Sequence, residues 1–229
     1  MSPLWPERVR VALCPERVLG ARLAFGRVTT KAEMPVEGAA ADSLVPLLAA
    51  LAATRACVAI TLSNRFARYF VLPWSAALES EADWQAFAER RFANLYGADA
   101  ALYLVQVASS EPGTPRVACA LERVLLDAIR HRLNAAGHRL VSLRPHFAVA
   151  FKRIADGDAW YVNQEPQQLT VGLALGGRWR SLRQRRVGPD WKERLPLILR
   201  RESQLAGLSS LTEKVNVAAS DDAFKMILH

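Results

Sequence analysis

Few residues in this 229-residue chain have the types and spacing that metal binding or catalysis requires. Asp156 and Asp158 flank a glycine, which suits either a metal or phosphate loop or an ordinary polar turn. His131 and His138 could share a helix face, but Gly137 lies between them and is expected to end that helix. We therefore expect the aspartates to form a turn and the histidines to hold no ligand.

The sequence also lacks the motifs that identify common reactions. It contains no GxxxxGKS/T phosphate loop, no GxGxxG fingerprint, no GxSxG nucleophile elbow and no HExxH metal site. Its cysteines, Cys14, Cys57 and Cys119, are odd in number, and none has the paired spacing that zinc requires. Each lies in an apolar, strand-like run, which predicts buried, reduced thiols. No catalytic residue and no metal site is predicted.

The most distinctive cluster is segment 63–75, SNRFARYFVLPWS, in which basic and aromatic residues are interspersed. Its pattern predicts a polar elbow followed by a strand that a Pro-Trp pair ends. Arginine, tyrosine and tryptophan are residue types that anchor protein interfaces. Two interpretations stay open: a structural hairpin with its tryptophan in the core, or a partner-binding surface. The residues of the second interpretation are Phe66, Arg68, Tyr69, Pro73 and Trp74.

The positive charge of the chain is concentrated in one region. The whole chain has 30 Lys and Arg and 22 Asp and Glu, a net charge of +8. Residues 116–201 alone carry 17 basic and seven acidic residues, a net charge of +10. The densest part is an arginine ribbon, which we define as Arg178, Arg180, Arg183, Arg185 and Arg186. Such a ribbon is either a solvated strand surface or a site for an anionic membrane surface or a nucleic acid.

The composition limits the class of protein. Hydrophobic residues make up 51% of the chain and charged residues 23%, which is typical of a folded globular protein. No stretch approaches the ~20 apolar residues of a membrane span. The N-terminus lacks the basic and apolar regions of a secretion signal. The composition therefore predicts a soluble, basic α/β protein of one large or two small domains.

Periodicity and turn residues predict the elements that would hold these clusters. Strands are expected at Val9–Cys14, Val18–Phe25, Ala56–Leu62, Arg68–Leu72, Ala101–Val107, Arg116–Leu121, His138–Leu143, Ala159–Asn163, Gln168–Leu175, Trp179–Val187 and Glu213–Ala218. Helices are expected at Asp42–Thr54, from Ser80 to Gly97, at Val124–Ala136, Pro145–Ile154 and Asp190–Gly207. We expect a loop over Gly26–Ala41 and a loose tail over Asp221–His229. Pro196 is expected either to break the last helix or to mark its first turn.

Four segments resemble a known family: TLSNRFARYFVLPWS, DWQAFAERRFANLYG, RVACALE and AAGHRLVSLRPHF. They are similar to the actin-like cytoplasmic domains of bacterial type IV pilus and type II secretion assembly platforms, the PilM, GspL and MshI group. The resemblance covers roughly residues 9–218. It implies an α/β, actin-like fold (ASKHA, RNase H-like) with two lobes and mixed sheets, here compact and truncated. The implied domains are an N-terminal lobe, 1–150, with a small inserted subdomain near 76–140, and a C-terminal lobe, 151–229.

Nucleotide binding is the property in which this sequence departs from the family. The resemblance implies an Asp and a Gly in the first hairpin turn, for the metal and the phosphates, but segment 13–17 is LCPER. Pro15 also lacks a backbone N–H donor. The matching turn of the second half, 163–167, lacks the pattern too, and Gly176-Gly177 is equally an ordinary hairpin turn. We therefore expect no ATP hydrolysis and no cofactor, with ATP and Mg as the alternative.

The resemblance implies a cytoplasmic, non-catalytic scaffold at the inner membrane, in other words a pseudo-ATPase. Expected partners are PilN-like inner-membrane proteins of a pilus or secretion system, the assembly ATPase and, in a homodimer, a second copy. Membrane contact is expected only peripherally or through a partner. Two alternatives stay open: an actin-like ATP-binding protein or ATPase with atypical motifs, and a nucleic-acid-binding protein that uses the arginine ribbon. Few aromatic residues accompany the ribbon, so nucleic acid is not the expected partner.

Overall fold

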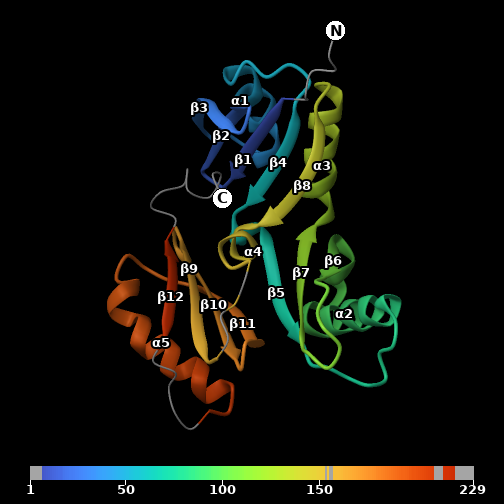
Figure 1. Cartoon of the computed structure of the whole chain (residues 1–229), viewed down its shortest axis with the longest axis vertical. Coiled ribbons are helices and arrows are strands. Elements are labelled where there is room, and N and C mark those ends of the chain that lie inside the picture. Colours follow the sequence, from blue (N-terminus) through green and yellow to red (C-terminus); the bar gives the residue numbers. More distant parts are fainter. Residues whose placement is uncertain (1–6, 153, 155–156, 209–213, 220–229) are drawn as a thin grey trace. The chain divides into compact units, whose positions relative to one another are not determined.

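The computed structural model describes residues 7–152, 154, 157–208 and 214–219 (Figure 1). Contacts divide the chain into two compact units. Of the described residues, unit 1 contains 7–67 and 121–150, and unit 2 contains 68–120 together with those from 151 to 219. The predicted lobes, 1–150 and 151–229, are a different division and stay a prediction.

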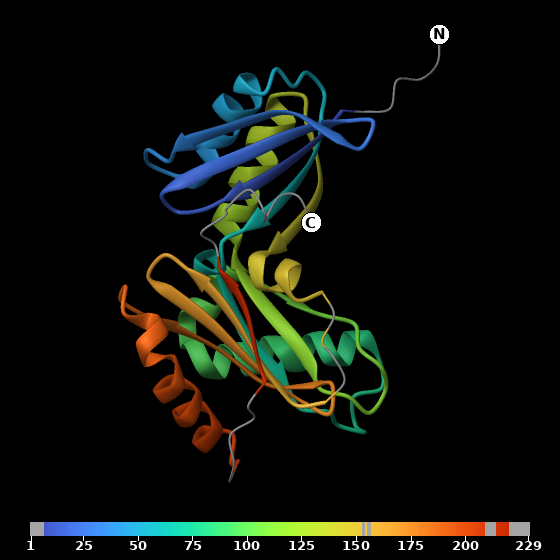
Figure 2. The same ribbon diagram turned by 60° about the vertical axis from the view of Figure 1, so that its left-hand side comes forward.

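Unit 1 is built on a five-stranded mixed sheet in the order β3-β2-β1-β4-β8 (Figure 2). Its strands are β1 (Arg8–Leu13), β2 (Arg17–Ala24), β3 (Arg27–Pro35), β4 (Cys57–Leu62) and β8 (Arg139–Pro145). β1 pairs antiparallel with β2 and parallel with β4, and β4 pairs parallel with β8. The register aligns Leu13 with Leu62, and Leu62 with Pro145. The carboxyl ends of β1, β4 and β8 therefore meet at one end of the sheet.

An apolar layer between the sheet and two helices forms the core of unit 1. The helical elements of this unit are η1 (Ala40–Ser43), α1 (Leu44–Ala50), η2 (Asn64–Phe66), α3 (Arg123–Ala135) and α4 (His146–Ala150). Val9, Val11 and Leu13 of β1 point into this layer because alternate strand residues share one face. A Cβ atom at Gly20 would lie 2.6 Å from Leu51 Cδ1, so the missing side chain lets the segment after α1 approach β2 closely.

The first sheet of unit 2 is three-stranded, in the order β5-β7-β6. Its elements are β5 (Ala67–Leu72), α2 (Glu81–Tyr96), η3 (Gly97–Leu102), β6 (Tyr103–Val107) and β7 (Arg116–Glu122). A capping box begins α2 at Ser80, the predicted start of this helix, since Ser80 Oγ accepts from Asp83 N at 3.1 Å and Asp83 Oδ2 accepts from Ser80 N at 2.9 Å. Trp84 and Phe92 of α2 are buried against the sheet.

The second sheet of unit 2 is four-stranded, in the order β11-β10-β9-β12. Its elements are β9 (Ala159–Glu165), β10 (Gln168–Leu175), β11 (Arg178–Arg186), α5 (Trp191–Leu205) and β12 (Val215–Ala219). The three strands β9, β10 and β11 are antiparallel, and β12 is parallel to β9. Trp191 and Leu199 of α5 pack on Trp160 and Val171 of one sheet face.

Two sequence expectations are wrong. The segment expected as a loop, Gly26–Ala41, contains strand β3, whose exposed polar residues alternate with half-buried ones along an edge of the sheet. Pro196 neither breaks the last helix nor lies in its first turn: α5 continues through it. The ring of Pro196 is exposed, so the helix loses one hydrogen bond on its solvent side only. The predicted tail, Asp221–His229, lies outside the described residues.

Candidate functional site

The β1–β2 turn is where the resemblance predicts nucleotide phosphates, and its backbone is already engaged. Cys14 N donates to Arg17 O at 3.0 Å, and Glu16 O accepts from Val36 N at 3.0 Å. Pro15, between them, has no N–H to donate. A phosphate needs several free backbone donors that converge on it. With Cys14 N paired and Pro15 without an N–H, two backbone donors of this turn are not available to a phosphate.

A charged pair occupies the same end of the sheet. The carboxylate of Glu16, in the turn, forms an ion pair with the guanidinium of Arg65, which follows β4. Ser63 holds Arg65 in place, because Ser63 Oγ accepts from Arg65 N at 3.2 Å and Ser63 N donates to Leu13 O at 2.9 Å. A carboxylate at this turn would repel a phosphate, and the arginine that could attract one is already paired.

Asn64 ties the third parallel strand to this site. Its side chain is fully buried, and Asn64 Oδ1 accepts from Phe147 N at 2.8 Å, at the start of α4 and just after β8. Ser63 is buried as well. The polar elbow predicted from segment 63–75 is therefore a structural junction between the ends of β1, β4 and β8. Sequence reasoning marked this elbow as polar but did not find its partners, Glu16 and Phe147.

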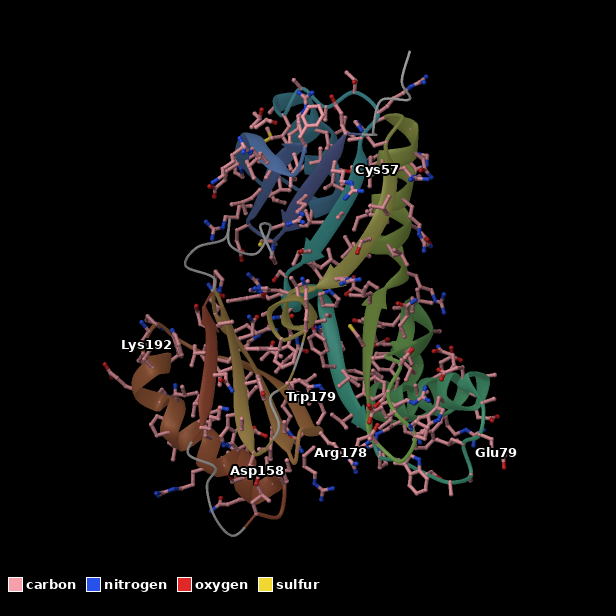
Figure 3. The ribbon with its side chains drawn as sticks, in the orientation of Figure 1. Cys57, Glu79, Asp158, Arg178, Trp179 and Lys192 are labelled. Atoms are coloured by element: carbon pink, nitrogen blue, oxygen red, sulfur yellow. The ribbon has the colours of Figure 1, made fainter. Side chains whose placement is uncertain are left out.

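The Gly176-Gly177 turn of the second half uses its own amides for hydrogen bonds within the chain. Gly176 and Gly177 have positive φ angles of 56° and 69°, as the two central residues of a hairpin turn do. Gly176 N donates to Asp158 Oδ1 at 2.8 Å, and Gly177 N donates to Gly157 O at 3.0 Å. Figure 3 labels Asp158 beside this turn. The glycines thus form an ordinary hairpin turn, and Asp158 accepts a bond from it. Asp156, the other aspartate of the turn expected around Gly157, lies outside the described residues.

The thiols and histidines of the described chain form no metal site. No group of three or more potential metal ligands occurs within the residues that the structure describes. Cys14, Cys57 and Cys119 are free thiols, each half-buried overall, and burial raises the pKa of Cys119 to about 12. His138 Nδ1 accepts from Ala56 N at 3.2 Å, so this imidazole joins α3 and β8 to the start of β4.

The predicted partner-binding residues are not equally accessible. Tyr69 is buried, Arg68 is half-buried, and Phe66 is partly buried against the core of unit 1. Pro73 and Trp74 are exposed, and Trp74 keeps 49% of its surface accessible. The alternative with Trp74 in the core is therefore wrong. Partner binding by these residues stays a prediction, now centred on Pro73 and Trp74.

Two residues of the arginine ribbon pair with a buried carboxylate, and the other three are exposed. Arg185 Nε donates to Glu202 Oε1 at 2.6 Å, and Arg183 Nε lies 3.2 Å from Glu202 Oε2. These two arginines face α5 because they occupy the same face of the sheet as Val171 and Leu169. The remaining members, Arg178, Arg180 and Arg186, are exposed. Binding of an anionic surface by the ribbon stays a prediction.

Comparisons of the fold with solved structures identify similar proteins. The cytoplasmic domain of EpsL, an inner-membrane component of the type II secretion system of Vibrio cholerae, matches with a TM-score of 0.64, 13% identity, and coverage of 96% of this chain and 92% of that one. A PilM–PilN type IV pilus biogenesis complex matches with a TM-score of 0.64, 14% identity, and coverage of 98% and 83%. A Bacteroides thetaiotaomicron protein with an actin-like ATPase fold and unknown function has a TM-score of 0.62, 9% identity, and coverage of 96% and 85%.

The chain has an actin-like fold. The fold class predicted from the sequence is thus confirmed. No family model and no curated protein sequence matches the chain. None of the helices in the described part of this actin-like chain has the length and apolar character that a bilayer crossing requires.

Proposed function

We propose that this chain is a cytoplasmic, non-catalytic scaffold in the inner-membrane assembly platform of a bacterial type II secretion system or type IV pilus. The observation that carries the proposal is the match along almost the whole of both chains to EpsL and to the PilM–PilN complex. In this role the chain would dock a short segment of a PilN-like inner-membrane protein, the assembly ATPase, or both.

The phosphate-side geometry supports the non-catalytic part of the proposal. The Glu16–Arg65 pair and the missing donor of Pro15 leave the β1–β2 turn without a phosphate-binding surface. The Gly176-Gly177 hairpin uses both of its amides internally. Isothermal titration with Mg-ATP is expected to give no heat of binding at ligand concentrations up to about 1 mM. A Kd above about 1 mM corresponds to a binding free energy weaker than about −4 kcal/mol. Micromolar binding would show an ATP-binding protein instead.

The docking part of the proposal is tested at Trp74. An aromatic side chain that is half-exposed in the free protein is a suitable anchor for a partner peptide. Trp74→Ala is expected to weaken binding of a PilN-like cytoplasmic peptide by at least about tenfold. Tyr96→Ala, which changes a 41% exposed aromatic side chain on α2, is the matched control. Equal binding by Trp74→Ala and the unchanged protein would remove Trp74 from the docking surface.

A further inference from the structure

The outer side of α5 carries an unusual row of residues. Leu197, Arg201 and Leu205 follow one another at intervals of four, so they lie in one line along the helix. Leu197 is 66% exposed and Leu205 is 53% exposed, and Arg201 between them is exposed as well. Arg200 adds a second exposed basic group next to this row. We call Leu197, Arg200, Arg201 and Leu205 the α5 outer row.

From residue 194 to residue 208 the chain has no exposed acid, and the exposed acid Glu193 lies one turn before Leu197 in the same line. The only acidic residue in that stretch is Glu202, which is 2% exposed. Its carboxylate is held by Arg185 and by Arg183, both from β11. The Arg183 side chain is itself 51% exposed, so this internal cluster has an excess positive charge that reaches the surface. Arg194, six residues before Arg200 in the same helix, approaches Asp190 only at 3.9 Å.

The arrangement has no structural explanation within α5. Arg200 and Arg201 make no ion pair with any residue that the structure describes. They precede the last turn of the helix, so they do not interact with its C-terminal carbonyl groups. The core contacts of α5 come instead from Trp191, Leu199 and half-buried neighbours. The leucines of the outer row therefore leave apolar area in water, which is a cost to the isolated protein.

We propose that the α5 outer row binds the surface of an anionic lipid bilayer directly. Basic residues interspersed with leucines on an exposed helix flank are the pattern of an interfacial helix, whose apolar side chains enter the headgroup region while arginines bind lipid phosphates. Both leucines of the row are more than half exposed, so their side chains are accessible to a lipid surface. Charge complementarity selects acidic lipids. This contact goes beyond the proposed function, because no protein partner is needed for it.

Vesicle co-sedimentation tests the proposal with the full chain. The probes are phosphatidylethanolamine vesicles that contain phosphatidylglycerol, and vesicles of phosphatidylcholine alone. We expect binding to the first and at least about tenfold weaker binding to the second. Arg200→Glu with Arg201→Glu should reduce binding to the anionic vesicles by about 20-fold or more, since each basic residue contributes about fivefold. Leu197→Ser with Leu205→Ser should reduce it by about tenfold.

Matched controls come from α2, which carries an adjacent exposed arginine pair and an exposed leucine. Arg90→Glu with Arg91→Glu introduces the same charge change, and Leu95→Ser changes a leucine that is 60% exposed. Both controls should bind anionic vesicles like the unchanged protein, and circular dichroism should show each variant folded. Raising the salt from about 0.05 M to about 0.5 M should release the protein.

Three outcomes would overturn the proposal. The first is equal binding to both kinds of vesicle, and the second is an equal loss in the α2 and α5 arginine variants, which would indicate general charge attraction. The third is no loss in the α5 variants. All of these tests are independent of Trp74 and of nucleotide. Failure here therefore leaves the proposed scaffold function standing, and failure of peptide docking leaves lipid binding standing.

Discussion

The carboxylate of Glu16 and the guanidinium of Arg65 form an ion pair between residues 49 positions apart in the chain. The pair joins the β1–β2 turn to the segment that follows β4. It exists because β1 and β4 are parallel neighbours whose last residues, Leu13 and Leu62, are in register. The pair lies where an actin-like nucleotide-binding protein is expected to hold phosphates. The positive charge of Arg65 at this position is therefore neutralised by Glu16 of the same chain.

The first prediction concerns the strength of this pair. The side chains of Glu16 and Arg65 are 56% and 28% exposed, and exposed ion pairs contribute little because water and salt screen them. A double-mutant cycle with Glu16→Gln and Arg65→Gln should give a coupling energy of about 0.5 kcal/mol in urea unfolding. A coupling energy above about 2 kcal/mol would mean that the pair is a main support of the sheet end.

The second prediction is that Asn64 stabilises unit 1 far more than its polar type suggests. Asn64→Ala removes the acceptor of Phe147 N and leaves a buried donor without that bond. The expected loss is about 1–3 kcal/mol in the free energy of unfolding, measured by urea titration. Asn94→Ala, on the exposed side of α2, is the control and should change the free energy of unfolding by less than about 0.5 kcal/mol. Equal effects at the two positions would contradict the buried bond.

These two sites show what the sequence could and could not predict. Apolar alternation predicted most strands, and Ser80 was correctly predicted as the start of α2, because both signals are local. The polar edge strand β3 was missed, because its stability depends on pairing with β2 rather than on its own apolar content. The roles of Glu16 and Asn64 depend on partners distant in sequence. Only the strand order brings these residues together.

The third prediction is a loss of stability on mild acidification at His138. Burial lowers the pKa of His138, and the charge of Glu7 opposes this shift. The neutral imidazole accepts from Ala56 N, and a proton on Nδ1 would abolish that bond. The folded state therefore binds this proton less readily than the unfolded state, so the contribution is present above the unfolded pKa of about 6.5 and is lost as the pH falls below it. Urea midpoints should drop between about pH 7.5 and about pH 5.

The control for this pH effect is His138→Gln. Its urea midpoint should be lower than that of the unchanged protein at about pH 7.5, with a smaller drop on acidification, because the titrating group is gone. The exposed His131→Gln variant should keep the full pH dependence. If His131→Gln removed the pH dependence of the urea midpoint instead, the group responsible would be His131 and not His138.

The fourth prediction is a difference in thiol reactivity. The thiolate is the reactive form of cysteine, and burial raises the pKa of Cys119 to about 12. Iodoacetamide at about pH 8 should therefore leave Cys119 unmodified in the folded protein, while Cys14 and Cys57 react slowly. All three should react in denaturant. Peptide mass spectrometry separates the sites, and rapid labelling of Cys119 without denaturant would show that β7 is open to solvent.

The fifth prediction concerns Phe25, at the tip of the β2–β3 hairpin. Its side chain is fully exposed, and its φ angle of 51° is followed by 76° at Gly26, the left-handed pair of a type I′ turn. Bulky residues adopt this conformation at a cost of about 1 kcal/mol or more, whereas asparagine favours it. Phe25→Asn should therefore raise the free energy of unfolding by about 1 kcal/mol. Phe25→Ala should gain less, because alanine lacks the short polar side chain by which asparagine hydrogen-bonds the local backbone in this conformation. A lower melting temperature for Phe25→Asn would mean that Phe25 stabilises the hairpin by contacts that its exposure does not show.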